Sequence, residues 1–444
     1  MPVPRVRLVV LNFNGGELVL RCLAHLERLD WPPDRLEIVV VDNASSDGSD
    51  LEVARRPRAR LIRSERNAGF PANNLALRDL DGIDYVGLVN NDAFAEPGYL
   101  QPLVDALESD EGLGAACPKI LLEPRFVDVR LRAPTHRPTR DDRDLGVRLM
   151  ALEVDGRERW REALFAEGWY PPEGGAGGHE FRWSAAEALL RVPVGCAPGV
   201  PKARLLVAAA RPGVAWVTAG ADKVPVDVSP MPVWVDVSLA GERYDVVNNV
   251  GSMLVEGGWG GDRGFLEPDA GQYDEPQDVF AWCGAGVLFR AGYLADVGLF
   301  DESFFMYYED TDMAWRGRAR GWRYRYIPDA VLRHVHAATA VEGSPLFHHF
   351  VERNRLVMLT KNAPRRLAAG AALRFLLSTA SYARRDVVRP MLRGRRPATG
   401  LVRARLGSFV GYLQMLPRVL SDRRKLRAGQ RVHDEAITGW AVDR

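Results

Sequence analysis

Three apolar runs in the first part of the chain are each followed at once by polar residues. The runs are Arg7–Leu11, Leu36–Val41 and Tyr85–Val89, and the polar segments that follow them are 12–14, 42–49 and 90–92. A helical pattern separates the first two runs, so the order is β-α-β and predicts a parallel sheet.

The polar residues at these strand ends predict a ligand site, because open α/β sheets bind ligands at the carboxyl ends of parallel strands. The side chains expected to converge in one crevice are Asn12, Asn14, Asp42 and Asn43. Each loop taken alone is also explained by turn formation, since Asn, Asp, Gly and Ser favour turns. Three polar strand ends in succession favour a site.

The middle of the chain, from about 124 to 245, changes to an alternation of apolar and polar residues with a period of two. The clearest segments are Val127–Leu131, Val224–Val228 and Val233–Val237, separated by turns rich in Pro and Gly. Many short alternating strands predict a β-sandwich inserted as a separate domain. Its aromatic residues Trp160, Trp169, Tyr170 and Trp183 either stack on sugars or are packed inside.

An acidic run follows at 304–316, where Glu309, Asp310 and Asp312 stand among aromatic residues. Charge in such surroundings is costly unless it is used, which indicates a site. Asp301 is expected to cap a helix through this run, and Gly321 to stop it.

On that helix Asp312 and Arg316 are i,i+4 neighbours, expected to pair at its surface. Asp310 lies about 200° from Asp312, so the two carboxylates are expected to face opposite sides.

After about residue 362 the chain has apolar positions at helical spacing with arginines between them. Two apolar stripes are expected, one of Leu373, Leu376, Leu377 and Ala380, the other of Val402, Leu406, Phe409, Val410, Leu413 and Leu416. From Arg365 to Arg427 there are 15 Arg and Lys425 against Asp386 and Asp422, a local net charge of +14. Basic amphipathic helices of this kind favour an anionic membrane surface. The alternative is ordinary packing with a solvated basic face.

Composition limits the function classes. The 444 residues carry a net charge of +1, so no general attraction to nucleic acid is expected. Cys22, Cys117, Cys196 and Cys283 are far apart and form no CxxC pair, which suggests neither a zinc site nor a disulfide framework. No signal peptide and no apolar run of about 18 residues is recognised, so we expect a cytoplasmic protein at the inner face of the plasma membrane.

The phosphate-binding motifs GxGxxG and GxxxxGK[ST] are absent from the sequence. Asp92 directly follows a buried strand and can offer carboxylate oxygen to a divalent cation that bridges the phosphates of a nucleotide. Asp42 is a candidate acceptor for hydrogen bonds from a base.

The motifs together resemble those of family 2 of the glycosyltransferases, the inverting enzymes with a GT-A fold. The resemblance covers roughly the first 120 residues and residues 250–360, and is greatest to bacterial rhamnosyltransferase-like members. The segments that carry it are Val10–Asn14, Val40–Gly48, Arg66–Phe70, Asn90–Asp92, Gly284–Gly286, Phe300–Glu302, Tyr308–Asp312, Pro328–Val331 and His334.

The resemblance implies roles for the matched positions. The nucleotide-sugar would be bound by Asn12, Asn14, Asp42, Asn43, Arg66, Asn67 and Asn91. Asp92 and His334 would hold Mg²⁺ or Mn²⁺. His334 and His336 alternate along a probable strand, so the alternative is that one of the two histidines is only packed there. In the metal motif Asn90 replaces the first Asp, which leaves Asp92 as the one charged ligand from this loop.

The acidic pair Glu309 and Asp310 would supply the catalytic carboxylates, with Asp310 as general base, because a sugar hydroxyl is a poor nucleophile near neutral pH. Trp282 is the candidate for stacking on the acceptor.

We therefore expect an α/β, Rossmann-like GT-A transferase with an inserted β-sandwich and a helical tail. The expected parts are 1–123 for the nucleotide-sugar, 124–245 for the β-sandwich, 246–361 for the acceptor and 362–444 for the tail. The expected reaction moves a sugar, rhamnose-like, from a dTDP- or UDP-linked donor to a glycan or lipid-linked acceptor in cell-envelope polysaccharide synthesis. The alternatives are a nucleotidyltransferase and a non-catalytic carbohydrate-binding protein.

Overall fold

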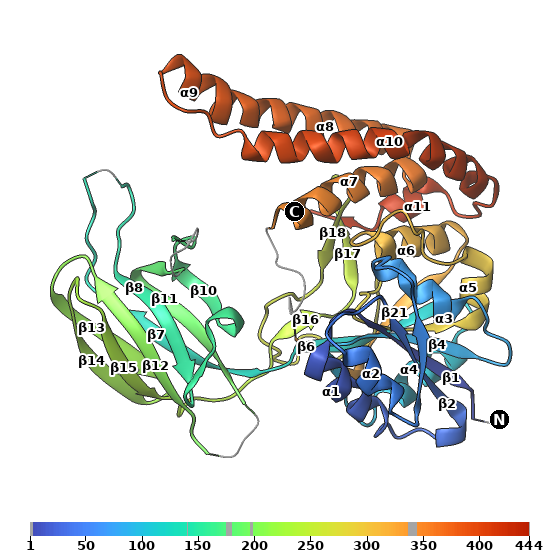
Figure 1. Ribbon diagram of the computed structural model, residues 1–444, viewed down its shortest axis with the longest axis horizontal. Helices are drawn as coiled ribbons and strands as arrows, with labels where there is room; N and C mark the ends of the chain where they lie inside the picture. The colour runs from blue at the N-terminus through green and yellow to red at the C-terminus, as the bar shows by residue number, and fades with distance from the viewer. Residues whose placement is uncertain (1–2, 140, 175–179, 196–198, 336–343, 444) are drawn as a thin grey trace. The chain divides into compact units, whose positions relative to one another are not determined.

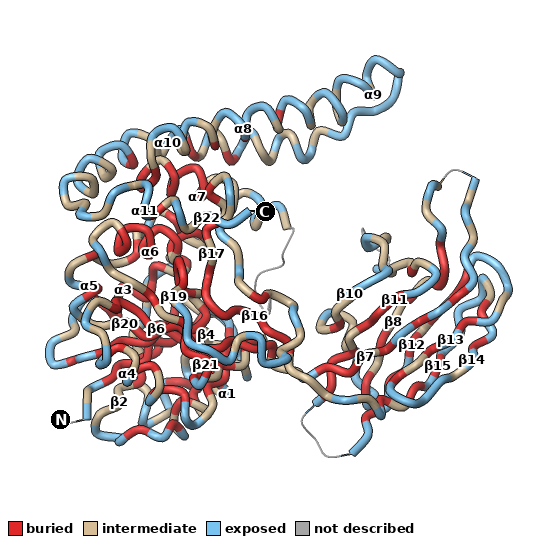
Figure 2. The backbone as a smooth tube through the Cα atoms, turned by 180° about the vertical axis from the view of Figure 1, so that it is seen from behind, coloured by how far each residue is buried: buried red, intermediate tan, exposed pale blue. Residues whose placement is uncertain are grey.

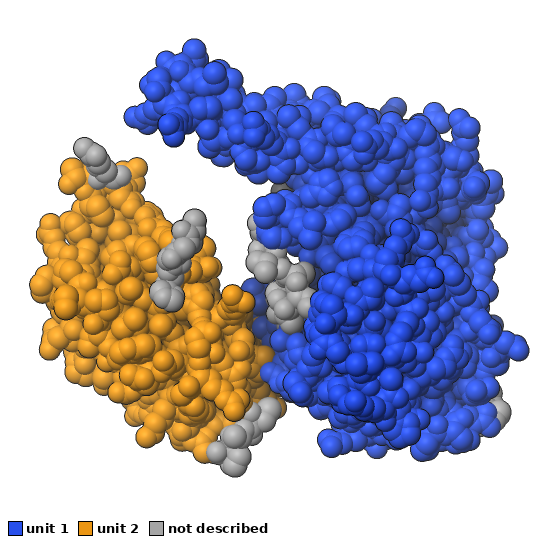
Figure 3. Space-filling model, viewed as in Figure 1, with its two compact units in different colours: residues 1–123, 247–444 blue, residues 124–246 orange. Residues whose placement is uncertain are grey.

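The computed structural model describes residues 3–139, 141–174, 180–195, 199–335 and 344–443. Two compact units make up the chain, 1–123 with 247–444 and 124–246 (Figure 3). The division falls where the alternation of period two begins and ends in the sequence. We call the two parts the α/β unit and the β unit.

The α/β unit is built on a ten-stranded mixed sheet with the order β19-β21-β6-β20-β4-β1-β2-β3, with β16 beside β6 and β5 beside β21 (Figure 1). Its strands are β1 Val6–Asn12, β2 Leu36–Asp42, β3 Ala59–Arg63, β4 Tyr85–Asn90, β5 Ala93–Ala95, β6 Leu113–Leu122, β16 Val247–Asn249, β19 Gln277–Asp278, β20 Gly286–Arg290 and β21 Arg323–His334. The neighbours β4, β1, β2 and β3 are parallel, as the β-α-β pattern predicts.

Helices cover both faces of this sheet. They are α1 Gly16–Leu26, α2 Ser49–Ala54, α3 Asn74–Leu77, α4 Leu100–Ser109, α5 Ala291–Val297, α6 Glu309–Ala319 and α7 Pro345–Asn362. Val6, Leu8 and Val10 of β1 pack with α1, α2 and α4 in one core, while Val9 faces the core that contains α3, α5, α6 and α7. Both faces of the strand are therefore apolar, as expected for a parallel sheet covered on two sides.

The β unit is a nine-stranded antiparallel sheet around its own apolar core. Its strands are β7 Arg125–Arg132, β8 Val147–Val154, β9 Arg157–Glu158, β10 Leu164–Trp169, β11 Arg182–Val194, β12 Lys202–Ala209, β13 Gly213–Ala219, β14 Asp222–Val228 and β15 Val233–Ser238. The long strand β11 pairs with β8 through Arg182 and Trp183 and with β7 through Glu187–Val194, so it joins two parts of the sheet. Both parts contribute to one apolar core, so the insert is a separate sheet unit.

The alternating segments form β7, β14 and β15, with buried and exposed residues taking turns along each strand (Figure 2). Two of the candidate stacking rings of this unit, Trp160 and Trp169, pack edge to face on Phe165 beside the core. The indole of Trp169 also donates to the Leu189 carbonyl at 2.8 Å. These two rings serve the packing of the unit.

The C-terminal helices belong to the α/β unit rather than to a separate tail. They are α8 Arg365–Ala383, followed by a π-helical turn Arg384–Val388, α9 Arg389–Leu392, α10 Gly400–Ala428 and α11 Asp434–Thr438. In the ribbon and in the tube seen from behind, α8 and α10 run side by side (Figure 1, Figure 2). Phe375 of α8 stacks on Phe409 of α10 with ring centroids 5.7 Å apart. Within the described residues, no helix has the length and apolar character needed to cross a membrane.

A small sheet completes the α/β unit near the N-terminus of α6. It consists of β17 Ser252–Val255, β18 Trp259–Asp262 and β22 Ala441–Val442. The backbone N–H of Gly260 on β18 donates to the hydroxyl of Tyr308, 3.2 Å away. The hairpin of β17 and β18 therefore lies against the acidic run.

Candidate active site

The polar residues at the ends of β1 and β2 lie together, as predicted. In the parallel register Asn12 stands opposite Asp42, and the Asn12 amide donates to the Asp42 carboxylate at 3.0 Å. The Asn14 side-chain oxygen accepts from the backbone N–H of Ser46 at 2.7 Å. A Cβ on Gly15 would lie 2.4 Å from the Asn12 side-chain oxygen, so only glycine leaves room for this arrangement.

The next loop joins this cluster to the acidic run. The Asn43 amide donates to the Asn67 side-chain oxygen at 2.9 Å, and the backbone of Phe70 donates to the carbonyl of Phe305 at 2.7 Å. Gly69 has φ +69°, and a Cβ there would collide with the Phe305 carbonyl. Arg66 is exposed in the same loop.

The predicted metal ligands are in contact with each other. His334 Nε2 lies 3.2 Å from Asp92 Oδ1, and both side chains are buried, at the point where β21 meets β5. Asn91 reaches back to Asn12 at 3.4 Å, which connects this pair to the strand-end cluster. His336 lies outside the described residues.

The donor set at this position suits a divalent cation. One carboxylate oxygen and one imidazole nitrogen face each other, a combination that first-row divalent metals accept. Among the described residues no cluster of three or more His, Cys, Asp or Glu could hold a metal ion. Asp92 and His334 thus supply two ligands, and a bound diphosphate would supply others.

Sequence reasoning missed Asn248, which holds His334 from its other side. Asn248 Oδ1 lies 2.9 Å from His334 Nδ1, and the Asn248 side chain is buried. The register of β16 against β6 shifts between Val247 and Asn249, so Asn248 is the extra residue of a β-bulge. Bulges commonly redirect a side chain near an active site, but nothing in the local sequence marks this one.

The helix that carries the acidic run begins later than predicted. Its first residue is Glu309, and the residue before it, Tyr308, has φ +68°. Asp301 does not cap the helix. Instead its carboxylate accepts from the backbone and hydroxyl of Ser303 and from Lys361 at 2.7 Å. The predicted stop is correct, since α6 ends at Ala319 and Gly321 has φ +99°.

The loop before α6 is strained, and a buried asparagine holds it. Phe305, Tyr307 and Tyr308 all have φ between +64° and +68°, a conformation that non-glycine residues adopt rarely and at a cost. Asn354 of α7 is fully buried, and its amide lies 2.7 to 2.9 Å from the carbonyls of Phe304, Met306 and Tyr307. Sequence reasoning also missed this residue.

The two aspartates of α6 face different surroundings, as predicted. Asp312 is fully buried and accepts from Arg316 at 2.9 Å, from Lys361 at 2.9 Å and from Asn362 at 2.7 Å. The Asp312–Arg316 pair therefore forms in the interior and not at the surface. Asp310 is only half-buried, and its carboxylate accepts from the N–H and the hydroxyl of Thr311 at 2.5 and 3.1 Å.

The surroundings of Asp310 raise its pKa towards the range in which a carboxylate can transfer a proton near neutral pH. The pKa of Asp310 is raised to about 6, because burial and the charge of Asp262 raise it by more than the hydrogen bonds from Thr311 lower it. Burial, and then the charge of Asp310, raise the pKa of Glu309 well above its ordinary value. Glu309 is thus neutral where Asp310 is charged, and Asp310 is suited to act as a base near neutral pH.

Asp262 is a third residue that the sequence did not single out. It is exposed on β18, and the amide of Asn249 donates to it at 2.6 Å. It comes near Asp310 only because the β17–β18 hairpin folds over the start of α6.

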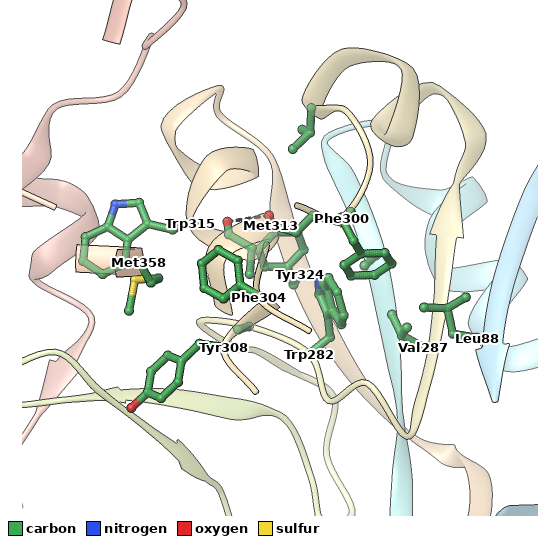
Figure 4. Packing of buried hydrophobic residues seen from close by; sticks show 14 of the residues in the cluster. Leu88, Trp282, Val287, Phe300, Phe304, Tyr308, Met313, Trp315, Tyr324 and Met358 are labelled. Atoms are coloured by element: carbon green, nitrogen blue, oxygen red, sulfur yellow. Dashed lines mark hydrogen bonds between the residues drawn. The ribbon is translucent and has the colours of Figure 1, made fainter. Parts of the chain in front are cut away.

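Trp282 is not available to stack on an acceptor, so that prediction is wrong. Its side chain is fully buried, in the core that also contains Phe300 (Figure 4). It meets Phe289 and Phe300 edge to face, at 4.8 and 6.0 Å between ring centroids. Phe304 and Tyr308 are buried in the same core, which agrees with the expectation that most aromatics of this region are structural.

Two family models match parts of the chain. Residues 8–147 match the family described as Glycosyl transferase family 2, and residues 266–376 match Glycosyl transferase family group 2. No curated protein matches the chain. Residues 8–147 and 266–376 are thus similar to family 2 glycosyltransferases. The fold is of the GT-A type and carries an additional sheet unit and C-terminal helices.

Two solved structures resemble the chain at low similarity. One is GalNAc-T7 with UDP, GalNAc and Mn²⁺, at 11% identity and a TM-score of 0.43, covering 81% of this chain. The other is the mannosyltransferase PcManGT from Pyrobaculum calidifontis in complex with GDP-Man and Mn²⁺, at 15% identity and a TM-score of 0.38, covering 98% of this chain and 79% of that one. The chain spans 48% of the length of GalNAc-T7.

Proposed function

We propose that the protein is an inverting glycosyltransferase in which Asp310 is the general base. The observation that carries the proposal is a half-buried carboxylate with a pKa raised to about 6, next to a strained loop that is tied to the strand-end cluster. Asp310 removes the proton from an acceptor hydroxyl as that oxygen attacks the anomeric carbon. The bond from this carbon to the diphosphate oxygen breaks, so a nucleoside diphosphate leaves from the opposite face and the anomeric centre is inverted.

The strand-end residues are proposed to bind the donor. At the carboxyl ends of β1 and β2, Asn12 donates to Asp42, Asn43 donates to Asn67, and Asn14 accepts from the backbone of Ser46. Such a preformed polar surface suits a base, a ribose and a diphosphate, with Arg66 and Asn91 at its borders.

Asp92 and His334 are proposed to hold Mg²⁺ or Mn²⁺ at the diphosphate. When bound, the cation would neutralise charge that develops on the leaving group. The chain's own contribution is to keep the two ligand atoms 3.2 Å apart in a buried position.

The resemblance of the sequence motifs also supports a proposal for the donor and the acceptor. The donor is a dTDP- or UDP-linked sugar, rhamnose-like, and the acceptor is a glycan or a lipid-linked glycan of the cell envelope. A thermal-shift screen of the full chain with nucleotide-sugars and metal would identify the donor, because a ligand at 100 times its Kd stabilises by about 2.7 kcal/mol.

Asp310→Asn tests the mechanism, and Glu309→Gln tests whether the neighbouring carboxylate is also needed. Loss of the base should lower kcat by about 10²- to 10⁴-fold. Glutamine resembles the neutral form of Glu309, so Glu309→Gln should keep most of the activity when Asp310 alone is the base. Both variants are checked for folding by circular dichroism and for donor binding by calorimetry.

Retained transfer by folded Asp310→Asn would overturn the mechanism. Release of pyrophosphate from a nucleoside triphosphate would instead indicate a nucleotidyltransferase. Glycan binding without transfer by the unaltered protein would indicate a carbohydrate-binding protein.

A further inference from the structure

Helix α8 is apolar on two opposite sides. Ala371, Phe375 and Thr379 are buried against the neighbouring helices. Leu373, Leu376 and Leu377 lie on the opposite side of the helix, and Leu377 is 61% exposed. A helix at the surface of a protein ordinarily presents polar residues to water, so this outward leucine face requires a partner.

The apolar surface continues beyond α8. Met391 and Leu392 of α9 are 61% and 82% exposed at the tip of the hairpin. On α10 the buried face contains Ser408 and Tyr412, while Leu406, Val410 and Leu413 of the predicted stripe are exposed. Phe375 and Phe409 are thus covered because α8 and α10 pack together, whereas Leu406, Val410 and Leu413 stay exposed.

Exposed arginines surround the tip of the hairpin. They include Arg384, Arg385, Arg389, Arg393, Arg395 and Arg396. Asp386, which Arg385 contacts at 2.6 Å, and Asp422 are the acidic residues between 365 and 427. The surface that offers apolar side chains is therefore also strongly positive.

We propose that the outer face of α8, together with the tip at α9, lies on an anionic lipid surface. Leucines would enter the interface between headgroups and acyl chains, and arginines would meet the headgroup charges. A second copy of the chain would bring the same positive charge and be repelled. A nucleic acid would match the arginines but not the exposed leucines. A protein held on this surface would use a lipid-linked acceptor. This assignment of the acceptor rests on the glycosyl transfer proposed above.

Vesicle sedimentation of the full chain tests this surface independently of activity. Vesicles of phosphatidylcholine with 30% phosphatidylglycerol, as a probe, should bind the protein, whereas phosphatidylcholine alone should bind it at least about tenfold more weakly. High salt should weaken but not abolish binding, because the apolar part is not screened.

Leu373→Glu combined with Leu377→Glu should weaken binding by about tenfold or more. The matched control is Leu51→Glu on α2, since Leu51 is 56% exposed and Leu373 is 58% exposed. The control should bind like the unaltered protein, and circular dichroism confirms that each variant is folded.

Three results would overturn the proposal. One is failure of the full chain to sediment with anionic vesicles at low salt. Another is equal binding by the double variant and the unaltered protein. The third is a dimer in analytical ultracentrifugation that the double variant abolishes, which would assign the leucine face to a second copy. Loss of glycosyl transfer with retained vesicle binding would count against the proposed activity alone.

The β-bulge at Asn248 carries a second inference. Asn248 Oδ1 is 2.9 Å from His334 Nδ1, while His334 Nε2 points to Asp92. An amide oxygen can only accept, so it favours hydrogen on Nδ1. The Asn90 amide, 3.4 Å from Nε2, can donate to a lone pair on that nitrogen. We infer that Asn248 is a positioning residue that prepares His334 for a divalent cation.

Mn²⁺ affinity, measured by electron paramagnetic resonance without substrates, tests this role. Asn248→Leu removes the acceptor and should weaken Mn²⁺ binding by about 10- to 100-fold. Asn248→Asp retains an acceptor oxygen and should restore affinity. Unchanged affinity in Asn248→Leu, or equal loss in both variants, would overturn the inference.

The unaltered protein provides a readout that does not depend on whether a variant folds. With Zn²⁺ as a diamagnetic probe, nitrogen NMR of the histidine rings should show His334 protonated at Nδ1. Protonation at Nε2 would overturn the assignment.

Discussion

The two units of the chain differ in what they bury. Within the described residues, the α/β unit buries Asp42, Asp92, Asp312, Arg316 and Lys361 together with many other polar side chains. In the β unit, Ser184 is the one buried polar side chain among the residues described. Its core is otherwise a set of Val, Leu and Ala residues from alternating positions.

This difference shows where the chain needs charge. A buried charge must be paired and hydrogen-bonded, and a hydrophobic replacement is often as stable, so charge is a poor way to stabilise a core. The β unit accordingly has an uncharged, apolar core. The α/β unit places charge around α6, next to the candidate base, where position and protonation matter.

The largest difference between the units is expected from removing one cation in each. Lys361 is 5% exposed and touches both Asp301 and Asp312, so Lys361→Met should lower the free energy of unfolding by about 3–5 kcal/mol. Arg204→Met breaks an exposed pair with Glu153 in the β unit and should cost about 0–1 kcal/mol. Denaturant unfolding measures both, and equal losses would contradict the contrast.

The same pairing predicts an acid dependence of stability. Burial disfavours the charge of Asp301, but Lys361 and Ser303 hold the pKa of Asp301 well below its ordinary value. A lowered pKa in the folded state contributes stability above the unfolded value of about 3.9 and loses it as the pH falls further. Lys361→Met should therefore flatten the fall in stability below about pH 4.

A smaller effect is expected at Asn354, which holds the strained loop. Asn354→Ala leaves the carbonyls of Phe304, Met306 and Tyr307 without that donor and should lower kcat about tenfold or more, with little change in donor affinity. Asn74→Ala is the matched control, because Asn74 is also buried and bonds the backbone of Phe300. A donor KM that rises while kcat stays constant would contradict a positioning role.

Protonation of Asp310 is expected to cause the fall in kcat/KM at acid pH. Because a base must be deprotonated, kcat/KM should fall about tenfold per pH unit below about pH 6. Asp262→Asn removes a charge that raises this pKa, so it should move the fall to lower pH. Asp236→Asn on an exposed edge of the β unit should leave the profile unchanged, and a shift in that control would point to a general effect of net charge.

The smallest effect is expected from removing the β unit. The chain enters and leaves this unit at adjacent positions, since Phe126 pairs with Tyr244 and β16 pairs with β6. Replacing residues 124–246 by a short linker should therefore leave donor affinity within about twofold, because the apolar core of each unit is separate. Calorimetry with the nucleotide-sugar measures this, and loss of donor binding in a folded variant would assign the β unit a part in the site.

Local patterns in the sequence predicted much of the architecture. Apolar runs ending in Asn12, Asp42 and Asn90 form neighbouring parallel strands, and the alternation from 124 onwards forms the β unit. Helical spacing also placed Asp310 and Asp312 in different surroundings. These features are determined by residues close together along the chain, because strand and helix periods act over a few positions.

Tertiary structure decided what the local pattern left open. Trp282 is buried by Phe289 and Phe300, Asp301 meets Lys361 instead of capping α6, and one face of α8 is covered while the leucine face is not. Asn248, Asn354 and Asp262 reach the site from other elements, 86 residues from His334 in the case of Asn248 and 50 from Phe304 in the case of Asn354. Such contacts depend on which surfaces pack together, and no periodicity of the separate segments specifies that.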